Sequence, residues 1–405
     1  MKPASSSSSQ LAVRRAASTT GLLFVLLLVA FTASSYSSLN TDRLVGAASS
    51  SRAKAAAACD VARGEWVPDP AAPYYTNATC PFIDSRQDCM KYGKPELGSI
   101  LRWRWRPRGC DLPRFDPAAF LRLARHRSIA FVGDSVARNH MQSLMCLLSA
   151  AEHPQEIQPR DCVHCTRSYH YRAHNFTVTV FWAPFLVRWN LTRAGALQFM
   201  DPHNVYLDEA DPEWARRVAG YDYVVLNGAK WFTRPVVLHE RGRVLGCSGD
   251  DCGDPGAARV PPHRAVRAAF RTALRALRDL PGFRGRVVVR TVAPPHYENG
   301  KWYDGGNCLR TRPVRSDETA LPETEAAFHA AQVEEFRDAA AGAADPGRFV
   351  LMDVSDMMQM RGDGHPGQYG HWPHEKVGFG IDCVHWCLPG PIDAWSELLL
   401  HLLTN

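Results

Sequence analysis

A short segment in the first half of the chain has the residue types of a nucleophile site. Gly133-Asp134-Ser135 follows an apolar run at residues 128–132, and apolar residues then recur at helical spacing. A serine between a strand and a helix lies beside unpaired N–H groups at the positive end of the helix dipole, where an oxyanion can be stabilised. Gly133 allows close backbone approach. A simple N-cap role for Ser135 explains the tripeptide equally well.

Serine is a weak nucleophile without a base, and the base is normally a histidine oriented by a carboxylate. The chain has 16 histidines, so the presence of one decides nothing. Asp382-Cys-Val-His385 is more specific, because one short loop carries both an acid and an imidazole. We therefore predict Ser135 as nucleophile, His385 as base and Asp382 as the orienting carboxylate. A surface loop fixed by cysteines is the competing interpretation.

A third polar element is Asn227-Gly228, which ends the apolar run at residues 223–226. Sites in α/β proteins lie at the carboxyl ends of strands, and the Asn227 amide could donate to an oxyanion. A plain Asn-Gly turn has the same local sequence.

The elements that must position these residues alternate along the chain. Strand-like runs at residues 128–132, 223–226, 286–290 and 349–352 are separated by helical stretches, which include 263–280 and 322–341. Residues 176–181 alternate like a further strand, and residues 388–403 end in a helix after Pro391. This order predicts an α/β fold with a parallel central sheet flanked by helices. Residues 59–110 are rich in Cys, Pro and Trp, and predict a cross-linked, loop-rich segment.

The N-terminus predicts the compartment. An apolar run at residues 21–33 follows Lys2, Arg14 and Arg15, and no acidic residue precedes Asp42. This pattern indicates a cytoplasmic N-terminus and a translocated remainder. We expect a cytoplasmic tail (1–20), a transmembrane signal anchor (21–36), a flexible stem (37–58) and a lumenal catalytic domain (59–405). A cleaved signal peptide is the alternative.

An oxidising compartment agrees with two further features. The cysteine count is even, at 12. Asn77, Asn175 and Asn190 each begin an Asn-x-Thr triplet and are candidate glycosylation sites. The net charge of +6 is spread over many arginines, so no nucleic-acid partner is expected.

Several motifs together make a family resemblance. The order of Gly133-Asp-Ser135, Asn227-Gly228 and Asp382-x-x-His385 resembles the SGNH/GDSL-type hydrolases. The sequence from about Cys59 to the C-terminus resembles the plant trichome birefringence-like family of polysaccharide O-acetyltransferases. The motifs that carry this likeness are VGDSVARN (132–139), RGDGHPG (361–367), DCVHWCLP (382–389), Cys59-Asp60 before GEWV (64–67), and WRWRP (103–107) before CDLP (110–113). The resemblance divides the lumenal part into a Cys-rich segment (59–127) and an esterase-like core (128–405).

The resemblance implies a single-pass type II protein of the Golgi membrane that O-acetylates a cell-wall hemicellulose through an acetyl-serine. Xyloglucan is the favoured acceptor, before mannan and xylan. The acetyl-positioning and oxyanion residues would be Gly133, Arg138, Asn227 and Gly228. An acetyl donor, or a membrane protein that supplies it, is required, and no bound cofactor or metal is expected. The family often has His or Gln where this chain has Lys230. The identity of the acceptor is therefore not inferred from the residue at this position.

The resemblance also implies long-range disulfides. They would join the 59–110 segment to Cys146 and Cys387, and Cys308 to Cys383. The cysteines concerned are Cys59, Cys80, Cys89, Cys110, Cys146, Cys308, Cys383 and Cys387. The pairs Cys162-x2-Cys165 and Cys247-x4-Cys252 could each supply half of a zinc site, but local disulfides are expected in a lumen.

Other side chains have both a structural and a functional interpretation. His365, His371 and His374 could form a metal site, although a structural Gly/Pro-rich loop is expected. Core packing is expected for each polar-flanked aromatic, and a solvated surface for the arginines at 290, 310 and 312. The aromatics that could instead line a sugar groove are Trp103, Trp105, Trp231, Trp302, Tyr303 and Trp372.

Three functions stay open on sequence. The first is a polysaccharide O-acetyltransferase. The second is a polysaccharide acetylesterase that uses the same three residues with water as acceptor. The third is a non-enzymatic protein that binds wall polysaccharide. Sequence does not separate the first two, because transfer depends on excluding water and binding an acceptor.

Overall fold

The computed structural model describes residues 59–157, 165–192, 201–249, 256–301, 303–375 and 380–404. The expected tail, anchor and stem lie outside these residues, as do Cys162, Cys252 and Trp302. In the described part of the chain, the helices are too short or too polar to span a bilayer.

The central sheet is built from β3 (Ser128–Gly133), β4 (Gln155–Ile157), β5 (Arg167–Tyr171), β6 (Phe176–Trp182), β9 (Tyr223–Leu226), β12 (Arg286–Arg290) and β13 (Phe349–Met352). Its strand order is β13-β12-β9-β3-β6-β5-β4. The five strands from β13 to β6 are parallel, whereas β5 and β4 run antiparallel to their neighbours. Most of the parallel strands are apolar runs because both of their faces are covered, whereas β6 alternates Thr with apolar residues.

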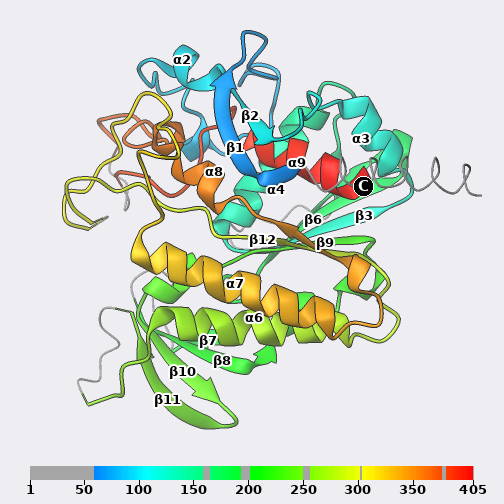
Figure 1. Ribbon diagram of the computed structural model, residues 1–405, viewed down its shortest axis with the longest axis vertical. Helices are drawn as coiled ribbons and strands as arrows, with labels where there is room; N and C mark the ends of the chain where they lie inside the picture. Colours follow the sequence, from blue (N-terminus) through cyan, green and yellow to red (C-terminus); the bar gives the residue numbers. More distant parts are fainter. Residues whose placement is uncertain are drawn as a thin grey trace, which may run out of the picture. The chain divides into compact units, whose positions relative to one another are not determined.

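Helices cover both faces of this sheet (Figure 1). The α-helices of the described residues are α2 (Leu97–Leu101), α3 (Pro117–Leu123), α4 (Ser135–Leu148), α5 (Pro212–Ala215), α6 (Pro262–Arg278), α7 (Glu323–Ala341), α8 (Ser355–Gln359) and α9 (Asp393–Thr404). One core lies between the sheet and α3, α4 and α9, and the other lies between the sheet and α6 and α7. Buried residues recur every three or four positions along α6, which gives that helix an apolar stripe.

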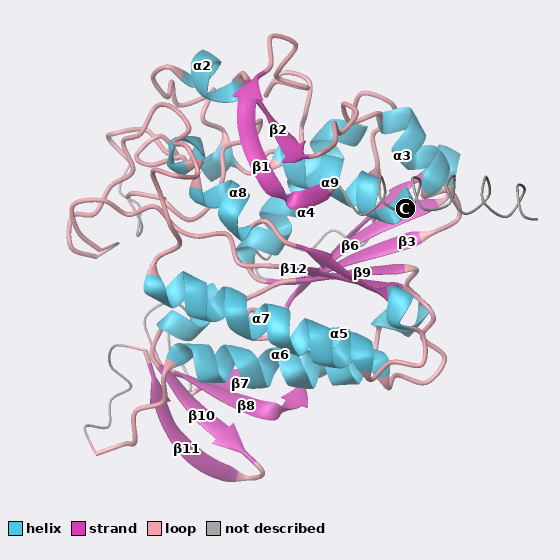
Figure 2. Ribbon diagram, in the orientation of Figure 1, coloured by secondary structure: helices cyan, strands magenta, loops and turns pink. Residues whose placement is uncertain are grey.

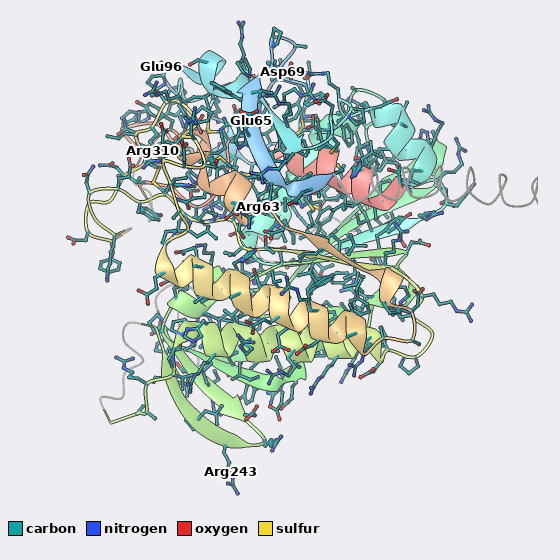
Figure 3. The ribbon with its side chains drawn as sticks, viewed as in Figure 1. Arg63, Glu65, Asp69, Glu96, Arg243 and Arg310 are labelled. Atoms are coloured by element: carbon teal, nitrogen blue, oxygen red, sulfur yellow. A yellow bond between two sulfur atoms is a disulfide. The ribbon has the colours of Figure 1, made fainter. Side chains whose placement is uncertain are left out.

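A second sheet packs against the far side of α6 (Figure 2). It consists of β7 (Val187–Leu191), β8 (His203–Ala210), β10 (Val236–Glu240) and β11 (Arg243–Ser248), in the order β11-β10-β8-β7. Arg243 projects from the tip of the β10–β11 hairpin, at the opposite end of the molecule from Glu96 (Figure 3). This sheet was not predicted from the sequence.

The N-terminal segment forms an antiparallel hairpin of β1 (Asp60–Pro68) and β2 (Trp103–Arg108). Trp66 anchors this hairpin, because its indole N–H donates to the carbonyl of Met357 on α8 at 2.8 Å. The guanidinium of the buried Arg361 lies 4.4 Å from the Trp66 ring centroid. The segment is otherwise loop-rich and cross-linked, as expected, but β1 and β2 were not predicted; aromatic side chains give these two strands a packed face.

Elsewhere the predicted α/β class is confirmed. Three predicted strands, β9, β12 and β13, have the observed bounds, and β3 extends one residue further than predicted, to Gly133. The two long helices were placed within two residues at each end. The prediction that the sheet is parallel fails only at β5 and β4, which return as antiparallel strands at one edge.

Candidate active site

Ser135 lies at the turn between β3 and α4, as predicted. The preceding Asp134 is the N-cap of α4, and its carboxylate accepts the Val136 N–H at 2.9 Å. Asp134 therefore takes the capping role that had been considered for Ser135. The Ser135 hydroxyl is left as the partly exposed group of the turn.

Gly133 is required for the approach of β9 to this turn. A Cβ at position 133 would overlap the Asn227 carbonyl oxygen and stand 2.6 Å from the Asn227 side-chain oxygen. Such overlap is not tolerated by a backbone held in a sheet. Gly133 therefore permits β3 and β9 to end side by side.

The structure brings the predicted nucleophile, base and acid together. The Nε2 atom of His385 lies 2.6 Å from the Ser135 hydroxyl oxygen, although 250 residues separate them. The Nδ1 atom of His385 lies 2.7 Å from a carboxylate oxygen of Asp382. In this arrangement the imidazole Nδ1–H donates to Asp382, so that Nε2 is free to accept the serine proton.

Asp382 is built to stay ionised. Its other carboxylate oxygen accepts the N–H groups of Val384 at 3.0 Å and His385 at 2.9 Å. Burial opposes ionisation, but the facing imidazole and these hydrogen bonds outweigh it and hold the pKa of Asp382 well below its ordinary value. The carboxylate charge can therefore stabilise an imidazolium at His385.

Two disulfides fix the loop that carries Asp382 and His385. Cys308 bonds to Cys383, and Cys89 bonds to Cys387, so bridges stand on both sides of His385. A third disulfide joins Cys80 to Cys146 on α4. These are the bridges that the resemblance implied. Disulfide bonds are also formed by Cys59, Cys110, Cys165 and Cys247.

The oxyanion candidates lie at the carboxyl end of β9. The backbone N–H of Asn227 donates to Val132 at 3.1 Å, and its side-chain amide points to the Asp134 carboxylate at 3.5 Å. Gly228 is held by α7, because the Gln332 side chain donates to its carbonyl at 2.7 Å and accepts the Val292 N–H at 2.8 Å. Gln332 is fully buried and was not predicted, because nothing in the local sequence of α7 distinguishes it.

Lys230 follows this turn and is partly buried beside it. Its ammonium group donates to Glu325 on α7 at 2.7 Å. Burial lowers the pKa of Lys230, while Glu325 and Asp134 favour its charged form. Lys230 and Gln332 both tie the Asn227–Gly228 turn to α7.

Arg138 lies one turn along α4 from Ser135 and is buried. Burial lowers its pKa, Arg86 and Arg167 act in the same direction, and the carboxylates of Asp84 and Asp134 act against them. This places the guanidinium among charges of the N-terminal segment and β5.

The remaining candidates fall into two groups. The three Asn-x-Thr asparagines, Asn77, Asn175 and Asn190, are all exposed, which suits glycan attachment; their glycosylation remains a prediction. The histidines His365, His371 and His374 do not converge: His365 is buried, whereas His374 is exposed. Within the described residues, no group of three or more metal-ligating side chains is found.

Arg290 was expected at the surface, and this was wrong. It is 2% exposed, its guanidinium lies 4.2 Å from the Trp395 ring centroid, and it donates to the Val136 carbonyl at 3.2 Å. Of the aromatic candidates, Trp105 and Trp231 are core residues. Tyr303 and Trp372 are exposed.

A mostly parallel α/β sheet with a serine at a strand–helix turn, joined to an Asp-x-x-His loop near the C-terminus, defines a protein of the SGNH-hydrolase class. Comparison with family models agrees. Residues 112–402 match the GDSL/SGNH-like acyl-esterase family found in Pmr5 and Cas1p, and residues 57–111 match the PMR5 N-terminal domain. The chain belongs to this acyl-esterase family.

Curated relatives match most of the chain. The chain is 46% identical to Protein trichome birefringence-like 20 of Arabidopsis thaliana, over 86% of this chain and 72% of the relative. It is 36% identical to xyloglucan O-acetyltransferase 2 of the same plant, over 85% of this chain and 82% of the relative. Xyloglucan O-acetyltransferase 4 of Populus trichocarpa is 39% identical to the chain, over 85% of this chain and 81% of the relative.

Proposed function

We propose that this protein is an O-acetyltransferase that acetylates sugar hydroxyls of a plant cell-wall hemicellulose. The observation that carries the proposal is the 2.6 Å contact between the Ser135 hydroxyl and His385 Nε2, with Asp382 behind the imidazole. Xyloglucan is the favoured acceptor, since relatives named xyloglucan O-acetyltransferases align with most of the chain. Mannan and xylan are the alternatives.

The first half-reaction forms an acetyl-serine. The Ser135 oxygen attacks the acetyl carbonyl carbon of the donor while His385 Nε2 takes the hydroxyl proton. We assign the tetrahedral oxyanion to the backbone N–H groups of Ser135 and Gly228, because those of Val136 and Asn227 already donate to Asp134 and Val132. The bond to the leaving group then breaks, and the leaving group takes the proton from the His385 imidazolium.

The second half-reaction returns the enzyme to its starting state. A sugar hydroxyl gives its proton to His385 Nε2 and attacks the carbonyl carbon of the acetyl-serine. The bond to the Ser135 oxygen breaks, and that oxygen takes the proton back. The products are an acetylated sugar and the regenerated Ser135 hydroxyl, so each cycle transfers one acetyl group from the donor to the sugar.

The proposal extends to the compartment. The apolar run at residues 21–33 after a basic segment supports a type II anchor in the Golgi membrane, with the catalytic domain in the lumen. The acetyl donor reaches Ser135 from that lumen, either as a free compound or from a donor-supplying membrane protein.

The test uses the full chain in detergent, an acetyl donor and defined xyloglucan, mannan and xylan oligosaccharides, with the products read by mass spectrometry. Ser135→Ala is expected to abolish transfer. Ser149→Ala, at the C-cap of α4, is the matched control and is expected to keep it. Transfer by Ser135→Ala would overturn the mechanism. Release of acetate by the wild-type chain without acetylated sugar would instead identify an esterase.

A further inference from the structure

Two buried histidines lie directly behind the base loop, and the reaction proposed above does not use them. His296 follows β12 and is 8% exposed, and His365 follows the short 3-10 turn Gly362–Gly364 and is fully buried. They lie 69 residues apart in sequence, yet their rings meet.

The two imidazoles form a chain that ends at the base. His365 Nδ1 lies 2.6 Å from the carbonyl oxygen of His385, and His296 Nε2 lies 3.0 Å from the carbonyl oxygen of Gln359. The two remaining nitrogens, His296 Nδ1 and His365 Nε2, face each other at 2.7 Å. All four ring nitrogens are therefore engaged.

A count of donors shows that two neutral rings cannot satisfy these contacts. A carbonyl oxygen only accepts, so His365 Nδ1 and His296 Nε2 must each carry a proton. A neutral imidazole has a single N–H, and both are then used. The nitrogens that face each other at 2.7 Å would both present lone pairs, and a buried contact of this kind is repulsive. One additional proton converts it into an N–H···N hydrogen bond.

The surroundings can accommodate one added charge. Three pairs of charged side chains lie around the two rings: Arg361 with Asp363, Lys230 with Glu325, and Arg310 with Glu298. The Asp382 carboxylate faces the neutral His385 ring, and its charge favours a proton on His365. Lys94 is the remaining cation, and it donates to the carbonyl oxygens of Asp363 and His365. The His365 ring stacks on Trp386, with ring centroids 4.1 Å apart, and an indole face favours a cation.

We propose that His296 and His365 share one proton, and that this singly protonated pair is a positioning device that holds the backbone of His385 where its ring can serve Ser135. The inference rests on the proposed function, since it assigns the pair a role in that reaction. The pair does not touch substrate. It acts through the hydrogen bond from His365 Nδ1–H to the His385 carbonyl.

Opposing effects set the pH at which the pair loses its proton. Burial lowers the pKa of His296 to about 4 and that of His365 well below its ordinary value, and the cations Arg310, Lys230 and Lys94 act in the same direction. The N–H···N bond acts in the opposite direction, because it exists only while the proton is present. The pair therefore binds one proton at a higher pH than either buried ring would alone, and it titrates as a unit.

Three substitutions separate the contacts. His296→Gln keeps a donor for the Gln359 carbonyl but leaves His365 without a facing nitrogen, so no shared proton is needed. His365→Asn keeps an amide N–H near the position of Nδ1, and His365→Gln places its amide near Nε2 instead. The matched expectation is that His365→Asn retains more transfer activity than His365→Gln. Thermal unfolding of each variant confirms that it is folded.

The first readout is independent of catalysis. In the ¹⁵N-histidine-labelled full chain, and in its Ser135→Ala variant, the two facing nitrogens are expected to show ¹⁵N shifts between those of protonated and unprotonated imidazole. In His296→Gln, His365 Nε2 is expected to be unprotonated over the same pH range. Spectra with both facing nitrogens unprotonated at every pH where the wild-type chain is folded would overturn the proposal.

The second readout is the pH profile of kcat/KM for acetyl transfer. Wild-type activity is expected to fall as pH rises through the pKa of the pair, and His296→Gln is expected to move that alkaline limb by about one pH unit or more. Identical profiles, or equal activity in His365→Asn and His365→Gln, would overturn the positioning role. A wild-type chain without transferase activity would instead contradict the proposed function, while the NMR result still decides on the shared proton.

Discussion

The side chain of Asn139 holds both backbone groups of Trp386. The Trp386 N–H donates to the Asn139 side-chain oxygen at 2.8 Å, and the Asn139 amide donates to the Trp386 carbonyl at 3.3 Å. Asn139 lies four residues after Ser135 on α4, and Trp386 follows His385. Two hydrogen bonds therefore join α4, which begins with the nucleophile, to the loop that carries the base.

Removal of these two hydrogen bonds should lower kcat more than it changes KM. Asn139→Ala leaves buried backbone groups of Trp386 unpaired, at a cost of about 1–3 kcal/mol each. We expect kcat for acetyl transfer to fall at least about tenfold with little change in KM, because a misplaced base slows the chemical step. Steady-state kinetics with one acceptor oligosaccharide test this. A change confined to KM would contradict it.

The Cys308–Cys383 bridge should matter for catalysis, whereas Cys80–Cys146 should matter mainly for stability. Replacing either pair by alanine is expected to cost about 2–4 kcal/mol of unfolding free energy. The Cys308/Cys383 variant should also lose acetyl transfer, since Cys383 adjoins Asp382. The Cys80/Cys146 variant should keep transfer at a temperature where it is folded. Equal kinetic effects of the two double variants would refute this distinction.

Gly133→Ala is expected to unfold or strongly destabilise the protein, because its Cβ would overlap the Asn227 carbonyl. The loss should exceed about 3 kcal/mol. Gly98→Ala on α2 is the control, since a Cβ there meets nothing within 4 Å, and its effect should stay within about 1 kcal/mol. Urea unfolding followed by circular dichroism measures both. A stable Gly133→Ala protein would show that β3 and β9 can separate.

Two buried carboxyl groups predict a pH dependence of stability. Burial raises the pKa of Asp393 to about 6 and that of Glu397 to about 7. Each group therefore binds a proton more tightly in the folded state, so its contribution is present below about pH 4 and is lost as pH rises through these values. We expect on the order of 3 kcal/mol per group.

Urea midpoints measured from pH 4 to pH 8 test this dependence. The double variant Asp393→Asn, Glu397→Gln should show a flatter profile than the wild-type protein. Asp382 contributes with the opposite sign, because its lowered pKa adds stability that is lost only as pH falls below about 4. A wild-type midpoint that rises from pH 5 to pH 7 would contradict the assignment.

The Lys230–Glu325 pair should be costly to break from one side. Lys230→Met leaves a buried carboxylate unpaired and is expected to destabilise the fold by about 3–5 kcal/mol. The double variant Lys230→Met, Glu325→Leu should recover most of this loss. Arg315→Ala, which breaks an exposed pair with Asp317, should change stability by less than about 1 kcal/mol. A double variant no more stable than Lys230→Met alone would exclude a pairwise interaction.

The sequence allowed prediction of the elements whose patterns are local. Strands β9 and β13 are apolar runs and β12 is three valines between two arginines, while the motif around Ser135 marks a strand–helix turn within eight residues. The second sheet was missed because its strands lack a clear apolar pattern: in β11, for example, Val244 and Leu245 are exposed whereas Ser248 is buried. His296 and Gln332 were missed for a different reason. Their hydrogen-bond partners lie 40 to 104 residues away in the sequence, so no local pattern predicts the roles of these two residues.

The Cys89–Cys387 bridge spans 298 residues and joins the N-terminal segment to the loop of His385. Ribosomes make chains from the N-terminus, so Ser135 emerges long before the imidazole that would activate it. Cys89 meets its partner only after the 298 residues up to Cys387 have been added. A chain that stops before Asp382 therefore carries the serine without its base, and the proposed acyl transfer requires synthesis to pass that loop.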